Sequence, residues 1–152
     1  MLIWKINLTE IVETLLDDYQ KSYPERSFSC SHPLKDADVL GDEFLIHEAL
    51  DNLLKNAVDF TGRDGHITVK IDHDATFADI AVIDDGQGIP DFAGKRVFEK
   101  FYSLPRPETG QKSSGLGLSI VREIAILHGG SAEIINNEGK GVQASFTIKN
   151  KL

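Results

Sequence analysis

The sequence predicts an α+β fold, a two-layer α/β sandwich in which a mixed sheet of about five strands carries three main helices on one face. Apolar residues recur at helical spacing in three segments and alternate at strand spacing in several shorter ones. These segments follow the order helix, strands, helix, hairpin, loop, helix, hairpin, with more strands than a repeating βαβ unit would supply. The length of 152 residues fits a single domain with its own core.

The helices are expected, in chain order, at residues 9–22, 42–60, 94–101 and 115–128. Asn7 or Thr9 can accept a hydrogen bond from the first turn of the first helix, and Asp42 can do the same for the second. Pro24 ends the first helix, because the residue before a proline avoids helical backbone angles. The glycine pair that begins at Gly129 ends the last helix.

The strands are expected at residues 27–31, 37–40, 67–71, 77–83, 131–136 and 142–148. Two pairs of these strands form hairpins that turn at residues 72–76 and 137–141. Residues 103–114 show no periodicity, and a segment of that length inside a compact domain is usually either functional or disordered. The sequence leaves both options open for this segment.

Composition excludes several classes of function. The chain carries 16 basic and 24 acidic side chains, a formal net charge of −8, which disfavours binding to nucleic acid or to anionic lipid. Cys30 is the only cysteine, so a disulfide framework and a thiolate metal cluster are both excluded. No apolar run reaches the roughly 18 residues that span a bilayer, and the chain is not expected to insert into a membrane.

Two other features are expected to have ordinary structural roles. His66, His73 and His128 share no metal-ligand spacing and are interpreted as surface or turn residues rather than as zinc ligands. Trp4 is expected in the core or in a contact with another domain.

The second expected helix carries an unusual polar line. Glu48, Asn52, Asn56 and Asp59 fall within an arc of roughly 80° on the helix, opposite the apolar side chains that face the core. The simplest explanation is a solvent-exposed face. Asparagine is a poor helix former, however, and oxygen atoms aligned in this way suit Mg²⁺, which often shares its ligands with substrate phosphates. Both explanations remain open for this helix.

A glycine-rich turn follows the strand expected at residues 77–83. Asp84 ends the strand, and Gly86 and Gly88 allow a sharp turn or the close approach of a flat ligand. A plain turn is one explanation. A carboxylate at the end of a buried strand is costly without a partner, and it could accept a hydrogen bond from an exocyclic amine such as adenine N6.

A second glycine-rich segment, at residues 113–119, leads into the last helix. Backbone N–H groups at the start of a helix form a site for anions such as phosphate. The segment is not a Walker A loop, because Gln111 rather than a glycine stands directly before Lys112 and no strand leads into the segment. It is not a dinucleotide-binding loop either, because the third glycine is missing. A helix with an early glycine remains the alternative explanation.

Together, the order and spacing of these motifs resemble the ATP-binding domain of sensor histidine kinases, in the superfamily that includes gyrase, Hsp90 and MutL. The matching segments are residues 52–57 (the N box), 84–88 and 115–118 (the glycine boxes), 98–102 (the F box), and 128–130, 139–141 and 146–148 near the end. The resemblance covers nearly the whole chain. It implies a single domain of the Bergerat (GHKL) fold, at residues 1–152, that binds ATP and Mg²⁺.

The resemblance also implies roles for individual residues. Asn56, helped by Asn52, would hold Mg²⁺ on the triphosphate, while Asp84 would accept a hydrogen bond from the adenine amine. The remaining nucleotide contacts would come from Phe60, Gly86, Gly88, Ile89, Lys112, Ser114, Gly115, Leu116 and Gly117. Phe60 and Ile89 would lie against the base, and Gly115 and Gly117 would bring backbone to the phosphates. Positive charge near the phosphates would come from Lys112 or Arg106.

Four positions depart from the pattern of this family. Asp59 stands where many members carry lysine, and Ser103 stands where many carry arginine. Ser113 and Val142 stand where glycine and threonine are common. These differences put the affinity for phosphate in doubt more than the identity of the nucleotide.

The phosphoacceptor motif of histidine kinases, a histidine followed by an acidic residue, a basic residue and proline, is absent from the sequence. The resemblance therefore implies a catalytic domain that transfers the ATP γ-phosphoryl group to a histidine on a separate dimerisation domain. Its expected catalytic residues are Glu48, Asn52 and Asn56. It further implies a response regulator as partner in the intact system, and a cytoplasmic location beneath an anchor in the bacterial inner membrane.

Other functions stay open for this sequence. Glu48, four residues before Asn52, matches the position of the general base in gyrase-type and MutL-type ATPases, so a self-contained ATPase is one alternative. A non-catalytic nucleotide-sensing module and a serine kinase of the anti-sigma type are the others.

Overall fold

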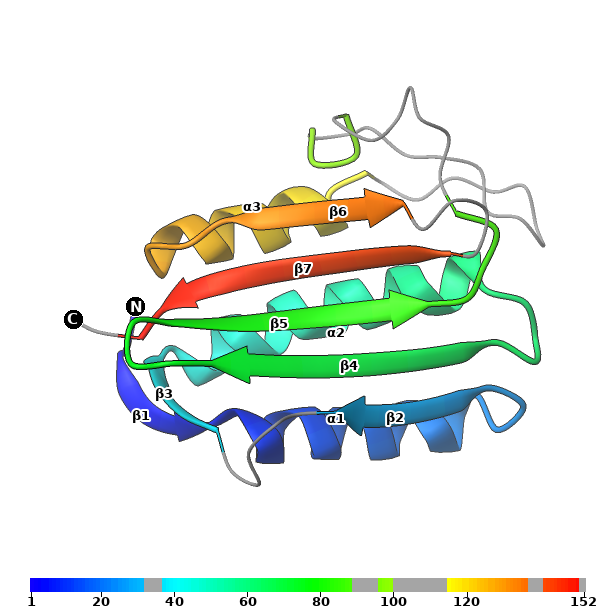
Figure 1. Ribbon diagram of the computed structural model, residues 1–152, viewed down its shortest axis with the longest axis horizontal. Coiled ribbons are helices and arrows are strands. Elements are labelled where there is room, and N and C mark those ends of the chain that lie inside the picture. Colours follow the sequence, from blue (N-terminus) through cyan, green and yellow to red (C-terminus); the bar gives the residue numbers. More distant parts are fainter. Residues whose placement is uncertain (32–36, 89–95, 100–114, 137–140, 151–152) are drawn as a thin grey trace.

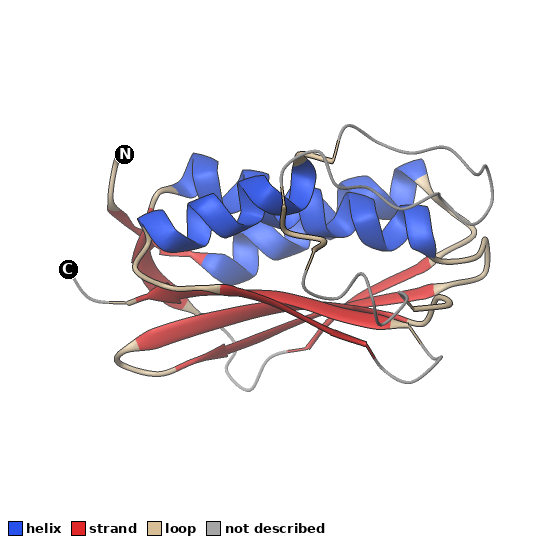
Figure 2. Cartoon of the chain, turned by 90° about the horizontal axis from the view of Figure 1, so that it is seen from above, coloured by secondary structure: helices blue, strands red, loops and turns tan. Residues whose placement is uncertain are grey.

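The computed structural model describes residues 1–31, 37–88, 96–99, 115–136 and 141–150. In these residues three helices cover one face of a five-stranded sheet, as the sequence predicts (Figures 1 and 2). The elements are β1 (Trp4–Asn7), α1 (Leu8–Ser22), β2 (Ser27–Ser31), β3 (Asp38–Gly41), α2 (Glu43–Phe60), β4 (His66–His73), β5 (Phe77–Asp84), α3 (Gly117–Leu127), β6 (Ala132–Asn136) and β7 (Val142–Lys149). None of these helices is both long enough and apolar enough to cross a bilayer.

The five-stranded sheet is mixed. Its strand order is β2-β4-β5-β7-β6, in which β2 and β4 run parallel and every other neighbouring pair runs antiparallel. Asp84, the last residue of β5, lies opposite Ile67 of β4. The preceding residue, Ile83, lies opposite Gln143 of β7. The sheet therefore carries Asp84 to one end of the domain, next to the start of β7.

Side-chain caps start the first two helices. The Asn7 side chain accepts a hydrogen bond from the N–H of Glu10 (3.2 Å), so Asn7 rather than Thr9 caps α1. Asp42 accepts a hydrogen bond from the N–H of Leu45 (3.1 Å) at the start of α2. Both helices therefore begin where the capping residues of the sequence predict.

The core lies between the helices and the covered face of the sheet. Its apolar side chains come from all three helices and from the inward positions of β4, β5 and β7. Leu50, Leu54, Ile67, Ile80 and Phe146 are each no more than 1% exposed. Burial of one such side chain contributes about 1.5–3 kcal/mol, so this layer fixes α2, with its polar line, relative to the sheet.

The chain also contains a strand that the sequence pattern does not predict. β1 pairs antiparallel with β3 in a separate two-stranded sheet. With four residues, β1 is too short to show a periodic pattern of its own. Trp4 lies on this strand with 65% of its surface exposed, so it does not belong to the core, and a contact with another domain stays a prediction.

His128 lies in the turn that follows α3, which is one of the two positions expected for it, but it is buried there rather than on the surface, with only 6% exposed. Its Nδ1 donates a hydrogen bond to the carbonyl oxygen of Ile124 (2.8 Å), and its Nε2 accepts one from the N–H of Asp42 (3.0 Å). Both ring nitrogens are used, which allows a polar ring to be buried here. His128 thereby joins the end of α3 to the start of α2.

The short helix expected at residues 94–101 falls only partly within the described residues. Residues 96–99 form a turn, in which the N–H of Glu99 donates a hydrogen bond to the carbonyl oxygen of Arg96 (2.9 Å). The rest of that segment, and the loop expected at residues 103–114, lie outside the described residues.

Candidate functional site

One end of the domain collects several of the expected site residues. The last turn of α2, the end of β5 and the start of β7 lie together there (Figure 1). Two contacts join them: Gly86 packs against the backbone of Phe60, and the N–H of Val142 donates a hydrogen bond to Asp84. The fold thus brings together residues from the middle and the end of the chain.

Asp84 is the only buried carboxylate among the described residues, with 7% of its surface exposed. Its Oδ1 accepts hydrogen bonds from the N–H groups of Gly86 (3.0 Å) and Val142 (3.3 Å). Burial raises the pKa of this carboxyl, the two N–H groups oppose the increase, and the negative charge of Asp85 adds to it. Both hydrogen bonds end on Oδ1, so Oδ2 is the oxygen that a ligand donor can use.

Three glycines pack closely at this end of the domain, and two of them, Gly86 and Gly141, contact Asp84. A Cβ atom on Gly86 would collide with the carbonyl oxygen of Phe60, and one on Gly141 would collide with that of Asp84 itself. Gly88 has a φ of +84°, and a Cβ there would lie 2.5 Å from a side-chain oxygen on β6. The protein's own packing therefore requires these glycines. The expected role of Gly86 and Gly88 in admitting an adenine base stays a prediction.

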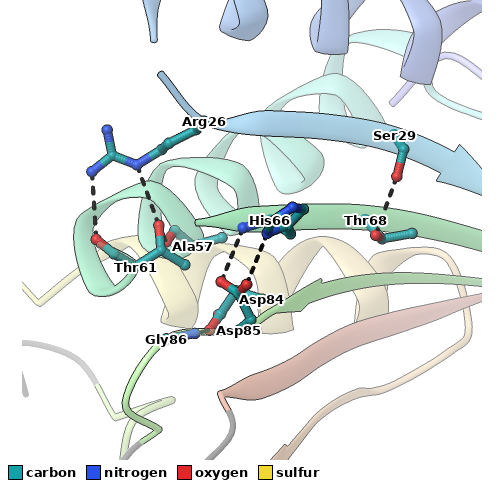
Figure 3. Close-up of polar contacts among 9 residues, drawn as sticks. All are labelled: Arg26, Ser29, Ala57, Thr61, His66, Thr68, Asp84, Asp85 and Gly86. Carbon is teal, nitrogen blue, oxygen red and sulfur yellow. Dashed lines mark hydrogen bonds and ion pairs between the residues drawn. The ribbon is translucent and has the colours of Figure 1, made fainter. Parts of the chain in front are cut away.

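A second carboxylate fastens the same turn. Asp85 Oδ1 accepts a hydrogen bond from the backbone N–H of His66 (2.9 Å), and its Oδ2 lies 3.0 Å from Nδ1 of the His66 ring (Figure 3). His66 is the first residue of β4 and is exposed, as expected for this histidine. The turn after β5 is thus held from β4 on one side and from β7 on the other.

The polar line on α2 is partly buried. Glu48, Asn52, Asn56 and Asp59 are each neither fully buried nor fully exposed, so this face is not a simple solvent-exposed surface. Asn52 Nδ2 donates a hydrogen bond to the carbonyl oxygen of Glu48 (2.9 Å). Asn52 Oδ1 would lie only 3.0 Å from a Cβ atom placed on Gly117. α3 therefore packs across this part of α2, and the absence of a side chain at Gly117 permits the approach.

The start of α3 lies two residues later than expected, at Gly117. Gly115, just before it, is buried and has a φ of +77°, a conformation that favours glycine. Ser119 Oγ donates a hydrogen bond to the carbonyl oxygen of Leu116 (2.8 Å). Among the described residues, no side chain caps this first turn, and N–H groups at the start of a helix are donors of the kind that bind anions.

A groove of about 520 Å³ lies between α2 and α3. The residues that line it are Phe44, Leu45, Glu48, Leu116, Ser119, Ile120, Glu123 and Ile124. Phe44 and Ile120 are large apolar residues that remain 70% and 39% exposed. Glu48 lines this groove about 18 Å along the helix axis from Phe60, at the end of α2.

Not every expected contact residue can be placed, because Ile89, Lys112 and Ser114 lie outside the described residues. Two neighbours of Asp84, namely Gly141 and Val142, were not predicted as parts of the site. A signal for them was available in the sequence, since a glycine-rich turn directly precedes the strand that becomes β7. That turn could be assigned to the site only once β7 was known to pair with β5, and this pairing comes from the structure.

A family profile described as "Histidine kinase-, DNA gyrase B-, and HSP90-like ATPase" matches residues 41–152. The matched range contains α2, the turn after β5 and the start of α3, which are the elements that build the site. The chain belongs to this family, and it is an ATP-binding catalytic domain of the sensor histidine kinase type.

Individual proteins agree with this assignment. The sensor protein CreC of Escherichia coli (strain K12) is 46% identical over 113 residues, which cover 74% of this chain and 24% of CreC. The sensor histidine kinase WalK of Bacillus subtilis (strain 168) is 31% identical over 150 residues, which cover 96% of this chain and 24% of WalK. The chain thus spans about a quarter of the length of these curated relatives.

Solved structures show the same fold. The catalytic domain of the histidine kinase ThkA superposes with a TM-score of 0.85 at 28% identity, over 99% of each chain. ThkA has also been solved in complex with the response regulator protein TrrA, where the TM-score is 0.78 at 27% identity, over 98% of this chain and 42% of that one.

Proposed function

We propose that this domain binds ATP with Mg²⁺ and transfers the γ-phosphoryl group to a histidine on a separate dimerisation domain of the same kinase. The observation that carries the proposal is the buried Asp84, whose Oδ1 is occupied by two backbone N–H groups and whose Oδ2 can accept a hydrogen bond from adenine N6. A guanine base would set its O6 against the same carboxylate, and such a mismatch costs about 1–3 kcal/mol. The proposal therefore includes a preference for ATP over GTP.

Asn56 and Asn52 are the proposed residues on the metal side of the site. Their carboxamide oxygens are hard ligands that fit Mg²⁺, which keeps several waters and shares its ligands with phosphates. Asn52 directs its Nδ2 to the backbone of its own helix, so its Oδ1 faces the start of α3. When bound, the ion would neutralise negative charge on the phosphates, while N–H groups at the start of α3 would orient them.

The groove between α2 and α3 is the surface proposed for the acceptor-histidine helix. The exposed side chains of Phe44 and Ile120 suit one apolar face of such a helix. The occupant follows from the proposed reaction, because the histidine must reach the γ-phosphate near the start of α3. Leu116, at that start, also lines the groove.

The remaining steps would take place outside this chain. A response regulator would receive the phosphoryl group from the histidine, and ThkA, which is similar to this chain, has been solved with such a partner. The domain would work in the cytoplasm as part of a sensor anchored in the bacterial inner membrane. This placement is supported by relatives that are named as sensors and are about four times as long as the part they share with this chain.

Calorimetric titration with ATP and GTP, with and without Mg²⁺, tests the proposal. We expect ATP binding that strengthens with Mg²⁺ and loses this dependence in Asn56→Ala. With γ-labelled ATP and the dimerisation hairpin of the same kinase added separately, the product should be acid-labile phosphohistidine. An acid-stable product would indicate a serine kinase instead, and absence of ATP binding under every condition would refute the proposal.

Glu48 supports a second candidate function, a self-contained ATPase. A general base must lie within about 3 Å of the proton it removes, directly or through one water. Glu48 lies one helical turn before Asn52 and lines an open groove, so water can reach it. Steady phosphate release by the domain alone would favour this function, provided that Glu48→Ala abolishes it and Glu123→Ala, on the opposite wall, does not. We expect little release, because the acceptor of the proposed reaction is a histidine.

A further inference from the structure

The carboxyl end of α2 carries an unfavourable charge pattern. The helix macrodipole places partial negative charge at this end, where lysine and arginine are stabilising. The last turn of α2 contains no basic residue, and it does contain Asp59. A positive group supplied by another element would therefore stabilise this end of the helix.

Arg26, in the turn between α1 and β2, supplies that charge. Its Nη2 donates hydrogen bonds to the carbonyl oxygens of Val58 (3.2 Å) and Thr61 (3.4 Å), and its Nε donates one to Thr61 Oγ1 (3.3 Å; Figure 3). The last carbonyl groups of a helix have no partner within the helix, so the guanidinium satisfies groups that need one. The Thr61 hydroxyl in turn donates to the carbonyl oxygen of Ala57 (2.9 Å).

The guanidinium group is itself held in place. It lies over the ring of Tyr23, with its central carbon 5.4 Å from the ring centroid, in a cation–π arrangement. The Gln20 side chain closes the turn, because its Nε2 donates to the carbonyl oxygen of Arg26 (2.7 Å) and its Oε1 accepts from the N–H of Phe28 (3.2 Å). Arg26 is thus a fixed contact rather than a mobile surface cation.

The helix end that Arg26 holds is also a wall of the candidate site. The carbonyl group of Phe60 packs directly against Gly86, and the N–H of Gly86 donates to Asp84 Oδ1 (3.0 Å). We propose that Arg26 is a positioning residue for the nucleotide site, because by fixing the end of α2 it sets the turn that orients Asp84. This inference rests on the proposed function and extends it to a residue that would not touch the nucleotide.

Three variants of the whole chain test this role. Arg26→Ala removes the contacts, Arg26→Lys keeps the charge but not the planar set of donors, and Arg122→Ala removes an exposed arginine from α3 as a control. Each variant is titrated with ATP and Mg²⁺ at a temperature at which circular dichroism shows it to be fully folded. The amide resonance of Gly86 is followed by NMR without nucleotide, since it reports the position of the turn directly.

In Arg26→Ala we expect roughly tenfold weaker ATP binding and a shifted Gly86 amide resonance. Arg26→Lys should recover part of the affinity, and Arg122→Ala should behave as wild type. Guanidinium ion at a few millimolar, far below denaturing concentrations, should also restore part of the affinity of Arg26→Ala. A purely structural role would lower the melting temperature without these effects.

Wild-type affinity together with an unmoved Gly86 amide in folded Arg26→Ala would overturn the proposal. If that variant does not fold, the same result in Arg26→Lys would overturn it. If the wild-type chain binds no ATP, the proposed function fails, while the Gly86 amide still decides whether Arg26 positions the turn.

Discussion

Exchange of Asp84 for asparagine changes one atom of the site and should affect stability and nucleotide binding in opposite directions. In the variant, the side-chain oxygen can still accept hydrogen bonds from Gly86 and Val142, whose N–H groups lie 3.0 and 3.3 Å from Oδ1. The Oδ2 position becomes an NH₂ group. The backbone around the site should therefore survive, and only the atom that faces the ligand changes.

The effect on stability follows from the pKa of Asp84. Burial raises that pKa in the folded chain, although the two N–H groups oppose the increase. Between the ordinary and the raised pKa the folded state binds more protons than the unfolded state, so the free energy of unfolding falls as pH rises through this interval. Above this interval Asp84 is charged while buried, and the chain has lost all of the corresponding stability. Asparagine is uncharged and does not carry this cost. Asp84→Asn should then melt no lower than wild type, and any advantage should vanish below the ordinary pKa of 3.8.

The effect on binding follows from the lost acceptor. The adenine amine would face an NH₂ group, and a buried donor without an acceptor costs about 1–3 kcal/mol. At 1.4 kcal/mol per factor of ten, this cost corresponds to about 5- to 150-fold weaker ATP binding. The same NH₂ group can donate to guanine O6, so the preference for ATP over GTP should shrink.

Calorimetric titration with both nucleotides and thermal melting of the same samples provide the assay. Asp85→Asn is the matched control, because it removes the neighbouring charge but keeps a side-chain oxygen. That oxygen can still accept the hydrogen bond from the N–H of His66, which is 2.9 Å from Asp85 Oδ1 in the wild-type chain. We expect this control to bind ATP nearly as wild type does. If Asp84→Asn is folded and binds ATP as tightly as wild type, the adenine assignment is wrong. If it does not fold, Oδ1 alone does not support the turn.

Three further predictions concern stability, each measured by urea denaturation. Burial and the carboxylate of Asp72, which lies opposite on β4, raise the pKa of Asp79. Asp79→Asn should therefore raise the free energy of unfolding by about 0.5 kcal/mol at pH values above that pKa, and this gain should disappear in acid. A gain in stability that does not depend on pH would contradict the reasoning. His128→Ala should lower the free energy of unfolding by about 2–3 kcal/mol, because it leaves a backbone N–H at the start of α2 without its acceptor; an unchanged midpoint would contradict it. Asn150→Ala should lower it by about 1–2 kcal/mol, since the side chain bridges β3 and the β4–β5 turn through hydrogen bonds of 3.2 and 3.0 Å. Wild-type stability of that variant would show the bridge to be negligible.

The parts of the fold that the sequence predicts are those with local signals. Asn7 and Asp42 mark helix starts through bonds to residues three positions away, and the long strands alternate along their own length. β1 lacks such a signal, because the strand with which it pairs in the described part of the chain is β3, which begins at Asp38. Its pairing with β3 is a tertiary contact, and a segment of four residues is too short to predict it from sequence pattern.

The same distinction applies to the site. Asp84 could be recognised because a carboxylate directly follows an apolar strand. Its partner Val142 could not, because it lies 58 positions further along the chain. The turn position of His128 agrees with the sequence, but its burial is not predicted for a similar reason, since the backbone N–H that makes this burial possible belongs to Asp42, 86 positions away. Local pattern therefore identified the chemical groups, whereas the pairing of β5 with β7 and of α2 with α3 decided their partners.

The glycines around Asp84 show why a sequence motif and a ligand contact are different kinds of evidence. An alanine at residue 86 would collide with the backbone of Phe60, and one at residue 141 would collide with the backbone of Asp84. Either substitution would displace the turn whether or not a nucleotide is bound. Loss of ATP binding in such variants would therefore report damage to the turn. Asp84→Asn keeps the backbone and alters the ligand-facing atom, so the adenine assignment depends on that exchange and the glycine variants cannot decide it.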